Sequence, residues 1–139
     1  MKNLFSIGSL IILSLMVGRF SAQDEDRSIA NNSRSFELRT YTTEAGKLEG
    51  LHTRFRDHTT ALFERHGMTN IGYWIPNERP NTLIYLLAHD SPEAAAQSWQ
   101  DFRQDGEWQR VYQASREDGP LVANVESIFL TATNYSDLK

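Results

Sequence analysis

The side chains best suited to chemistry lie on short segments in which polar and apolar residues alternate. A segment that reads FELRTYT places Glu37, Arg39 and Tyr41 on one side of an extended strand. Trp74 and Glu126, from two later alternating segments, are expected on the same face. Arginine suits bidentate contacts with a carboxylate or a phosphate. We expect a structural ion pair between Arg39 and Glu37 or Glu126, and anion binding by Arg39 is the alternative hypothesis.

The four histidines do not have the spacing of a metal site. On one helix, His52 and His66 would lie roughly 21 Å apart, and His58 would point about 120° away from His52. Because the chain has no cysteine and no histidine pair at i, i+4, we predict no metal and no cofactor. His66 precedes Gly67 at an expected helix end, which favours a structural role. His58 is a candidate general base or haem ligand, and His89 is a further candidate.

Composition and missing motifs exclude several classes of protein. The chain has no G-x-S-x-G nucleophile motif, no phosphate-binding glycine-rich loop and no dinucleotide fingerprint. It contains 14 basic and 18 acidic residues, and this net charge of −4 argues against nucleic-acid binding, which needs a clustered basic face. The absence of cysteine excludes disulfides, thiolate nucleophiles and thiolate-bound metals.

The first 35 residues are expected to lie outside the folded domain. A positive Lys2, a mostly apolar run over residues 4–17 and the small pair Ser21-Ala22 are typical of a bacterial signal peptide over residues 1–22. The run is shorter than the about 18 apolar residues of a membrane span. We predict export to the periplasm or the medium without a membrane span after cleavage, and an uncleaved anchor is the alternative. Residues 23–35 are predicted to be a disordered linker because they offer almost nothing apolar to bury.

Changes of hydrophobic period divide residues 36–133 into elements in the order β-α-β-β-α-β. Ser91 and Pro92 have the residue types that begin a helix. The expected strands are 36–42, 68–75, 82–89 and 122–131, and the expected helices are 48–66, 92–104 and 107–115. Residues 134–139 are expected to form a flexible tail.

This order predicts an α+β fold, a ferredoxin-like antiparallel sheet with its helices on one face. The apolar side of the first strand, Phe36 with Leu38, is expected beneath the helices, which leaves Arg39 and Tyr41 on the open face. A face that carries aromatic side chains is not expected to stay exposed to water. We therefore predict a homodimer in which two sheets close a barrel around a pocket. The pocket candidates are Arg39, Tyr41, His58, Trp74 and Glu126.

The order and spacing of five short blocks resemble the NIPSNAP family. The blocks are FELRTYT at 36–42, AGKL at 45–48, FERHG at 63–67, GYW at 72–74 and GEW at 106–108. The resemblance implies a dimeric α/β barrel, a group that includes cofactor-free monooxygenases, haem-degrading enzymes and small isomerases. Many NIPSNAP-domain proteins have no established activity. The better-known mitochondrial members carry two such halves, whereas this chain has one, so their roles are not transferred to it.

Three functional hypotheses follow from these observations. The first is an exported homodimeric module that binds a small apolar or amphipathic molecule, or a protein partner, without catalysis. The alternative, implied by the resemblance, is a cofactor-independent monooxygenase or isomerase with Arg39, Tyr41, His58 or Trp74 lining its site. Haem handling is the third hypothesis.

Overall fold

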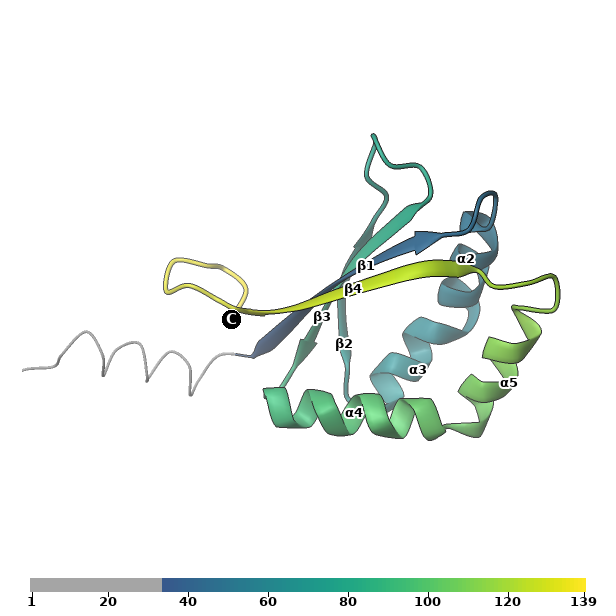
Figure 1. The fold of residues 1–139 in the computed structure, drawn as a ribbon. Coiled ribbons are helices and arrows are strands. Elements are labelled where there is room, and N and C mark those ends of the chain that lie inside the picture. The colour runs from purple at the N-terminus through teal and green to yellow at the C-terminus, as the bar shows by residue number, and fades with distance from the viewer. Residues whose placement is uncertain (1–33) are drawn as a thin grey trace, which may run out of the picture.

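A computed structural model describes residues 34–139, so the expected signal peptide and residues 23–33 of the expected linker lie outside the described residues. The four strands form one antiparallel sheet in the order β2-β3-β1-β4 (Figure 1). The strands are β1 (Ser35–Thr43), β2 (Thr69–Trp74), β3 (Thr82–His89) and β4 (Val122–Thr131). The helical segments are α2 (Leu48–Arg54), η1 (Phe55–Thr59), α3 (Thr60–Arg65), α4 (Pro92–Gln104) and α5 (Gly106–Ala114). The predicted α+β, ferredoxin-like fold is confirmed.

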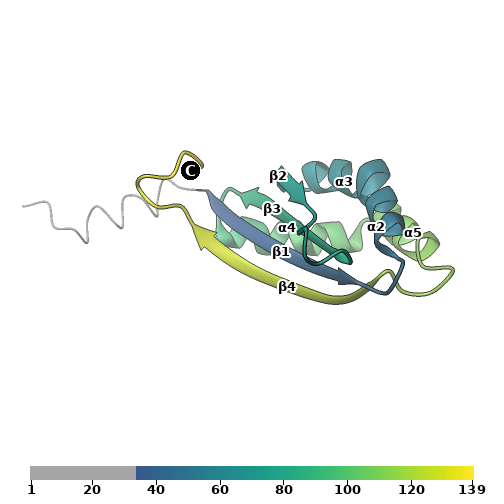
Figure 2. The same ribbon diagram turned by 90° about the horizontal axis from the view of Figure 1, so that it is seen from above.

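All helices lie on one side of the sheet, and β4 forms one of its two edges (Figure 2). Large apolar side chains from the helices pack on the sheet and form the core. That core contains Leu51, Phe55, Leu62, Phe63, Met68, Leu83, Tyr85, Leu87 and Phe102. Within residues 34–139, no helix has the length and apolar character needed to cross a bilayer.

The first helical region contains a π-helical turn, η1, between α2 and α3. The Thr60 amide donates to the Phe55 carbonyl five residues earlier, and Thr59 Oγ1 donates to the Arg54 carbonyl at 3.1 Å. Such a turn holds one more residue than an α-helical turn, and single π turns are frequent at functional sites. Here it brings Arg54, Phe55 and Thr59 to the wall of one cavity.

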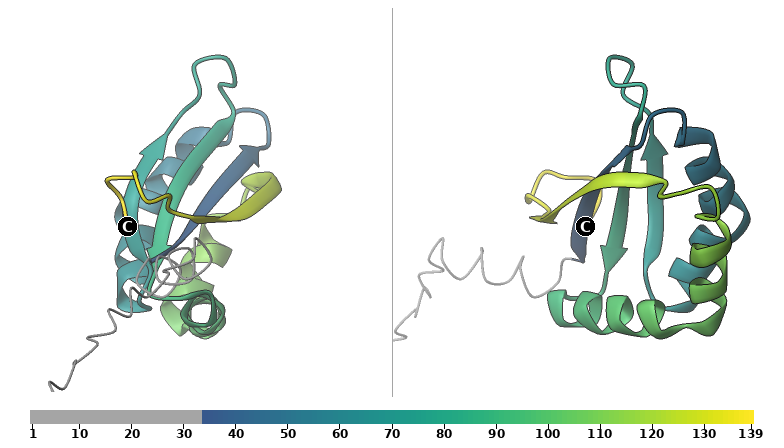
Figure 3. Two further views of the ribbon diagram at one scale, coloured as in Figure 1. Left: turned by 90° about the vertical axis from the view of Figure 1, so that its left-hand side faces the viewer. Right: turned by 45° about the vertical axis from the view of Figure 1, so that its right-hand side comes forward.

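Capping side chains begin both α4 and α5. Ser91 Oγ accepts from the Ala94 amide at 3.1 Å and begins α4, as the sequence predicts. Asp105 Oδ1 accepts from the Glu107 and Trp108 amides at 2.7 and 3.1 Å and begins α5. The chain turns between these two helices, so that α5 runs upward beside the sheet toward the beginning of β4 (Figure 3).

The register of β1 corrects one sequence prediction, the assignment of its two faces. Glu37, Arg39 and Tyr41 stand opposite Leu87, Tyr85 and Leu83, which belong to the core on the helix side. Directly opposed residues of antiparallel strands share a face. The three polar side chains therefore face the helices, and the expectation that they lie on the open face is wrong. Alternation gives the period of a strand but does not say which face is buried, and here the buried polar groups are hydrogen-bonded.

The open face is instead predominantly apolar. Leu38, Leu86 and Ile128 stand opposite one another across three strands, and Ile128 is 54% exposed. At one end of this face, Ser136 and Leu138 of the predicted tail border a hollow together with Phe36, Leu86 and Leu130. The rest of this face has no covering layer among residues 34–139.

Candidate functional site

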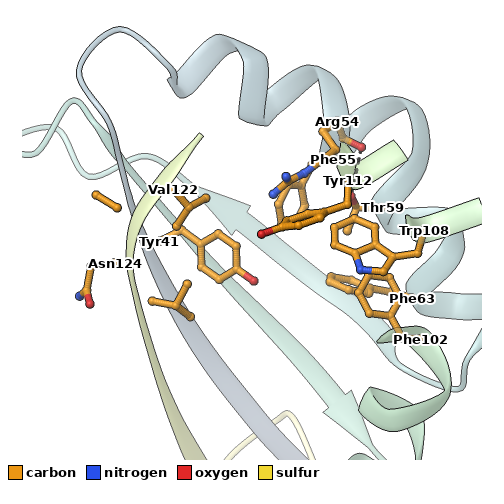
Figure 4. A pocket seen from close by; sticks show the side chains of 12 residues that line it. Tyr41, Arg54, Phe55, Thr59, Phe63, Phe102, Trp108, Tyr112, Val122 and Asn124 are labelled. Atoms are coloured by element: carbon orange, nitrogen blue, oxygen red, sulfur yellow. Dashed lines mark hydrogen bonds between the residues drawn. The ribbon is translucent and has the colours of Figure 1, made fainter. Parts of the chain in front are cut away.

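A cavity of about 340 Å³ lies between the sheet and the helices (Figure 4). Its volume falls in the range of small-molecule sites. The walls come from β1, α2, η1, α3, α4, α5 and the first residues of β4. Six of its 12 lining residues are aromatic: Tyr41, Phe55, Phe63, Phe102, Trp108 and Tyr112. We call this cavity the aromatic cleft.

A second hollow of about 410 Å³ adjoins the aromatic cleft. The two share four lining residues, Tyr41, Phe102, Trp108 and Tyr112. Arg39 and Trp99 line the second hollow but not the first, and the Arg39 guanidinium lies 4.3 Å from the centre of the Trp99 ring. The space between β1 and α5 is therefore continuous with a region that contains a buried charge network.

The centre of this network is Glu37, which is 1% exposed. Its Oε1 accepts hydrogen bonds from Arg39 Nη1 and Ser127 Oγ, both at 2.6 Å. Its Oε2 accepts from Trp99 Nε1 at 2.6 Å and lies 3.0 Å from His89 Nε2. Four partners from four different elements therefore converge on one carboxylate.

Hydrogen bonding keeps this carboxylate ionised. Burial alone would raise the pKa of Glu37, but the contacts with His89, Ser127, Trp99 and Arg39 outweigh burial and lower it to about 2. Burial likewise would lower the pKa of Arg39, but Tyr85, Tyr41 and Glu37 outweigh it and raise the value. Because both groups stay charged near neutral pH and bind each other, the network is suited to holding strands and helices together. It is not suited to proton transfer.

The expected ion pair between Arg39 and Glu37 is thus present, on the helix side of the sheet. Glu126 does not take part, because it stands opposite Thr40 on the open face and accepts from Asn124 Nδ2 at 3.3 Å. The alternative role for Arg39, binding of an external anion, is weakened because its charge is already paired.

The five pocket candidates are not brought together. Tyr41 lines both hollows, and Arg39 lines the second one. His58 is exposed on η1 and borders a separate groove with Arg110. Trp74 is 52% exposed at the end of β2 and lies across Gly72. The structure therefore places Tyr41 and Arg39 beside the cleft, and His58, Trp74 and Glu126 away from it.

The other histidines have structural partners. His66 lies at the end of α3, as expected, and its Nε2 is 2.8 Å from Asp105 Oδ2. His89 is fully buried against Glu37. Among residues 34–139, no group of three or more His, Cys, Asp or Glu side chains is arranged to hold a metal ion.

Sequence reasoning missed Arg54, Trp108 and Tyr112 as cleft residues. Arg54 is 5% exposed and follows the buried Leu51 by three positions, so it lies on the buried side of its helix. That spacing was visible in the sequence, since an arginine within an apolar stripe is unusual. Trp108 and Tyr112 are four residues apart on α5, and this spacing by itself fits ordinary core packing equally well.

Solved structures with similar folds were found, whereas no curated protein matches the chain. A NIPSNAP family protein of unknown function from Agrobacterium tumefaciens is 19% identical, with a TM-score of 0.68, over 77% of this chain and 95% of that one. An uncharacterised NIPSNAP domain protein from Burkholderia xenovorans is 20% identical, with a TM-score of 0.64, over 73% and 97%. The cofactor-independent oxygenase SnoaB from Streptomyces nogalater is 16% identical, with a TM-score of 0.52, over 75% and 99%.

These likenesses show the fold, and the sequence itself shows the family. The NIPSNAP family model matches residues 36–137, which include every strand and helix except the first residue of β1. The protein belongs to the NIPSNAP family.

Proposed function

We propose that this protein is a homodimeric module that binds a small molecule in the aromatic cleft. The observation that carries the proposal is the cavity of about 340 Å³ between β1, β4 and α5, half of whose lining residues are aromatic. A concave site with apolar walls and few polar groups is the usual form of a small-molecule site. Tyr41 and Tyr112 add hydroxyl groups that suit an amphipathic ligand.

The alternative is a cofactor-independent monooxygenase or isomerase. It is supported by the fold shared with SnoaB, a cofactor-independent oxygenase. The geometry favours binding, because none of the 12 residues that line the aromatic cleft is a histidine or a carboxylate that could serve as a general base. Consumption of oxygen or turnover of a compound bound in the cleft would instead favour the enzyme.

The binding proposal is tested with 2-naphthamide, a neutral aromatic probe, by isothermal titration calorimetry. Val125 stands opposite Tyr41, lines the cleft and is 44% exposed, so a larger side chain there can occupy the cleft without a buried clash. We expect the Val125→Trp variant to bind the probe at least tenfold more weakly than the wild type. Ala114→Trp, on the exposed side of α5, is the matched control and is expected to bind as the wild type does. Equal affinities for wild type and Val125→Trp would contradict the proposal.

We also propose export, with removal of residues 1–22. The support is the charged start, the apolar run over residues 4–17 and the pair Ser21-Ala22. The mass of protein recovered from the periplasm of its bacterial host should correspond to a chain that begins at Gln23. A mass that includes residues 1–22 would favour the uncleaved anchor.

A further inference from the structure

The aromatic cleft contains a buried cation that has no anionic partner among the described residues. Arg54 is 5% exposed and forms no ion pair within residues 34–139. Its Nη1 donates to Ser115 Oγ at 3.2 Å, and its buried Nε has no partner there. Burial lowers the pKa of Arg54, but a guanidinium stays protonated in proteins. A buried charge without a partner of opposite charge destabilises the folded state, so its presence here needs an explanation.

Aromatic rings compensate for part of this cost. The Arg54 guanidinium carbon lies 5.3 Å from the centre of the Trp108 ring and 5.5 Å from that of Tyr112, within the range of cation–π attraction. Ring faces stabilise the positive charge but leave the directed N–H donors of the guanidinium free for a planar anion. Figure 4 shows the Arg54 guanidinium beside the Phe55 and Tyr112 rings in the wall of the cleft.

The cleft contains one buried charge, and a second, exposed cation lies at its border, where Arg116 Nη1 donates to the Tyr112 hydroxyl at 2.9 Å. Of its lining residues, only Arg54 is ionised at neutral pH. In the adjoining hollow, the charge of Arg39 is neutralised by Glu37 at 2.6 Å, and Arg103 is exposed on α4. A ligand seated against Arg54 would therefore meet one buried positive charge, which a single carboxylate neutralises.

We propose that the cleft binds a small aromatic monocarboxylate and that Arg54 pairs with the carboxylate while the aromatic walls enclose the ring. This inference rests on the proposed function, because it names the ligand class of the same cleft. The ligand's charge takes the place of the missing anionic partner. In this interpretation, the unpaired buried arginine lowers the stability of the ligand-free protein and increases its affinity for the ligand.

The test compares two probes of the same shape, 2-naphthoate and the neutral 2-naphthamide, by calorimetry on the full-length protein. Wild type is expected to bind the carboxylate at least tenfold more tightly than the amide. The Arg54→Met variant keeps the volume but removes the charge, and it is expected to bind both probes equally. It is also expected to unfold at a higher temperature than wild type without ligand, because its apolar side chain carries no buried charge.

Matched variants separate this role from general effects of charge. Arg56→Met removes an exposed arginine two residues along the chain, and Arg54→Lys keeps the charge but not the planar fork. We expect Arg56→Met to retain the full preference for the carboxylate and Arg54→Lys to retain part of it. A crystal structure of the wild-type complex gives a reading that does not depend on any variant, with the carboxylate about 3 Å from the guanidinium.

The outcomes separate the two proposals. If neither probe binds wild type, the proposed function and this inference both fail. If both probes bind wild type equally, the cleft is a binding site but the inference is overturned. A carboxylate preference that survives Arg54→Met also overturns it. Arg54 borders a second groove of about 530 Å³ with Ala114, so loss of binding in Ala114→Trp but not in Val125→Trp would place the anion there and overturn the assignment to the cleft.

Discussion

At the scale of single residues, the ionisation of the buried Glu37 side chain contributes to stability. Its pKa is about 2 in the folded protein, below the ordinary 4.5, because four hydrogen-bond partners outweigh the effect of burial. A lowered folded-state pKa means that the ionised form stabilises the fold at pH values above about 4.5, and that this contribution is lost as the pH falls toward 2. The difference corresponds to about 3 kcal/mol in the free energy of unfolding.

The variant Glu37→Gln tests this role. It removes the charge but keeps the shape, and it leaves Arg39 without its carboxylate. We expect the free energy of unfolding in urea to fall by about 3 kcal/mol at pH 7, because one member of a buried pair is removed. We also expect a smaller loss of stability than wild type shows between pH 5 and pH 2.5.

Glu49→Gln is the control for this prediction. Glu49 faces Arg56 at 3.8 Å with a side chain that is 78% exposed, and such surface pairs contribute little. Its substitution is expected to change stability by less than about 0.5 kcal/mol. The role assigned to Glu37 is contradicted if the two variants have the same stability and the same pH dependence.

At the scale of secondary-structure elements, Asp105 connects three helices. It accepts from two amides at the start of α5 through one oxygen, and its other oxygen contacts His66 at the end of α3. The His66 contact and these amides hold the pKa of Asp105 at about 2. Since α5 carries Trp108 and Tyr112, this corner positions one wall of the aromatic cleft.

Two substitutions at Asp105 separate capping from charge. We expect Asp105→Ala to lower the free energy of unfolding by about 1–2 kcal/mol and to weaken ligand binding, because the cap of α5 is lost. Asn is also a good N-cap, so Asp105→Asn is expected to cost less and to keep α5 in place. Asp101→Ala, at an exposed position of α4, is the control and is expected to leave both quantities nearly unchanged. Urea unfolding and calorimetry measure both effects, and equal losses in the Ala and Asn variants would exclude capping as the cause.

At the scale of the whole molecule, the open sheet face determines the expected assembly. The half-buried centre of this face is flanked by exposed apolar residues from the two edge strands. These are Trp74, Ile128 and Leu130, whose exposed fractions are 52%, 54% and 40%. Apolar patches of this kind mark interaction surfaces, and a twofold partner covers such a face with its own equivalent. This supports the proposed homodimer.

The variant Ile128→Glu tests the dimer. Burial of a charge in an apolar interface is expected to shift the protein to monomers while leaving its far-ultraviolet circular dichroism spectrum unchanged. Light scattering after size exclusion measures the mass. Ala114→Glu, on the exposed side of α5, should remain dimeric. A wild-type protein that is monomeric at micromolar concentration would contradict the proposal before any variant is made.

The sequence alone was sufficient for the order of elements and the fold class. Hydrophobic periods change sharply between strands and helices, and capping residues such as Ser91 act locally, so a one-dimensional pattern contains this information. The pairing of Arg39 with Glu37 was also accessible, because residues two apart on a strand share a face.

Only the tertiary structure decided which face of β1 is buried and where the cleft lies. Both faces of that strand carry bulky residues, and the polar face is the buried one. It can be buried because the Glu37 carboxylate is hydrogen-bonded by Ser127, His89 and Trp99. Each of these residues is at least 52 positions away along the chain. The same holds for Arg54. Its guanidinium finds a hydroxyl group, Ser115 Oγ, beyond the end of the neighbouring helix but no partner for its buried Nε, and the sequence pattern does not show this. Local pattern determines secondary structure, whereas burial and charge compensation depend on contacts between distant segments, which only the folded chain brings together.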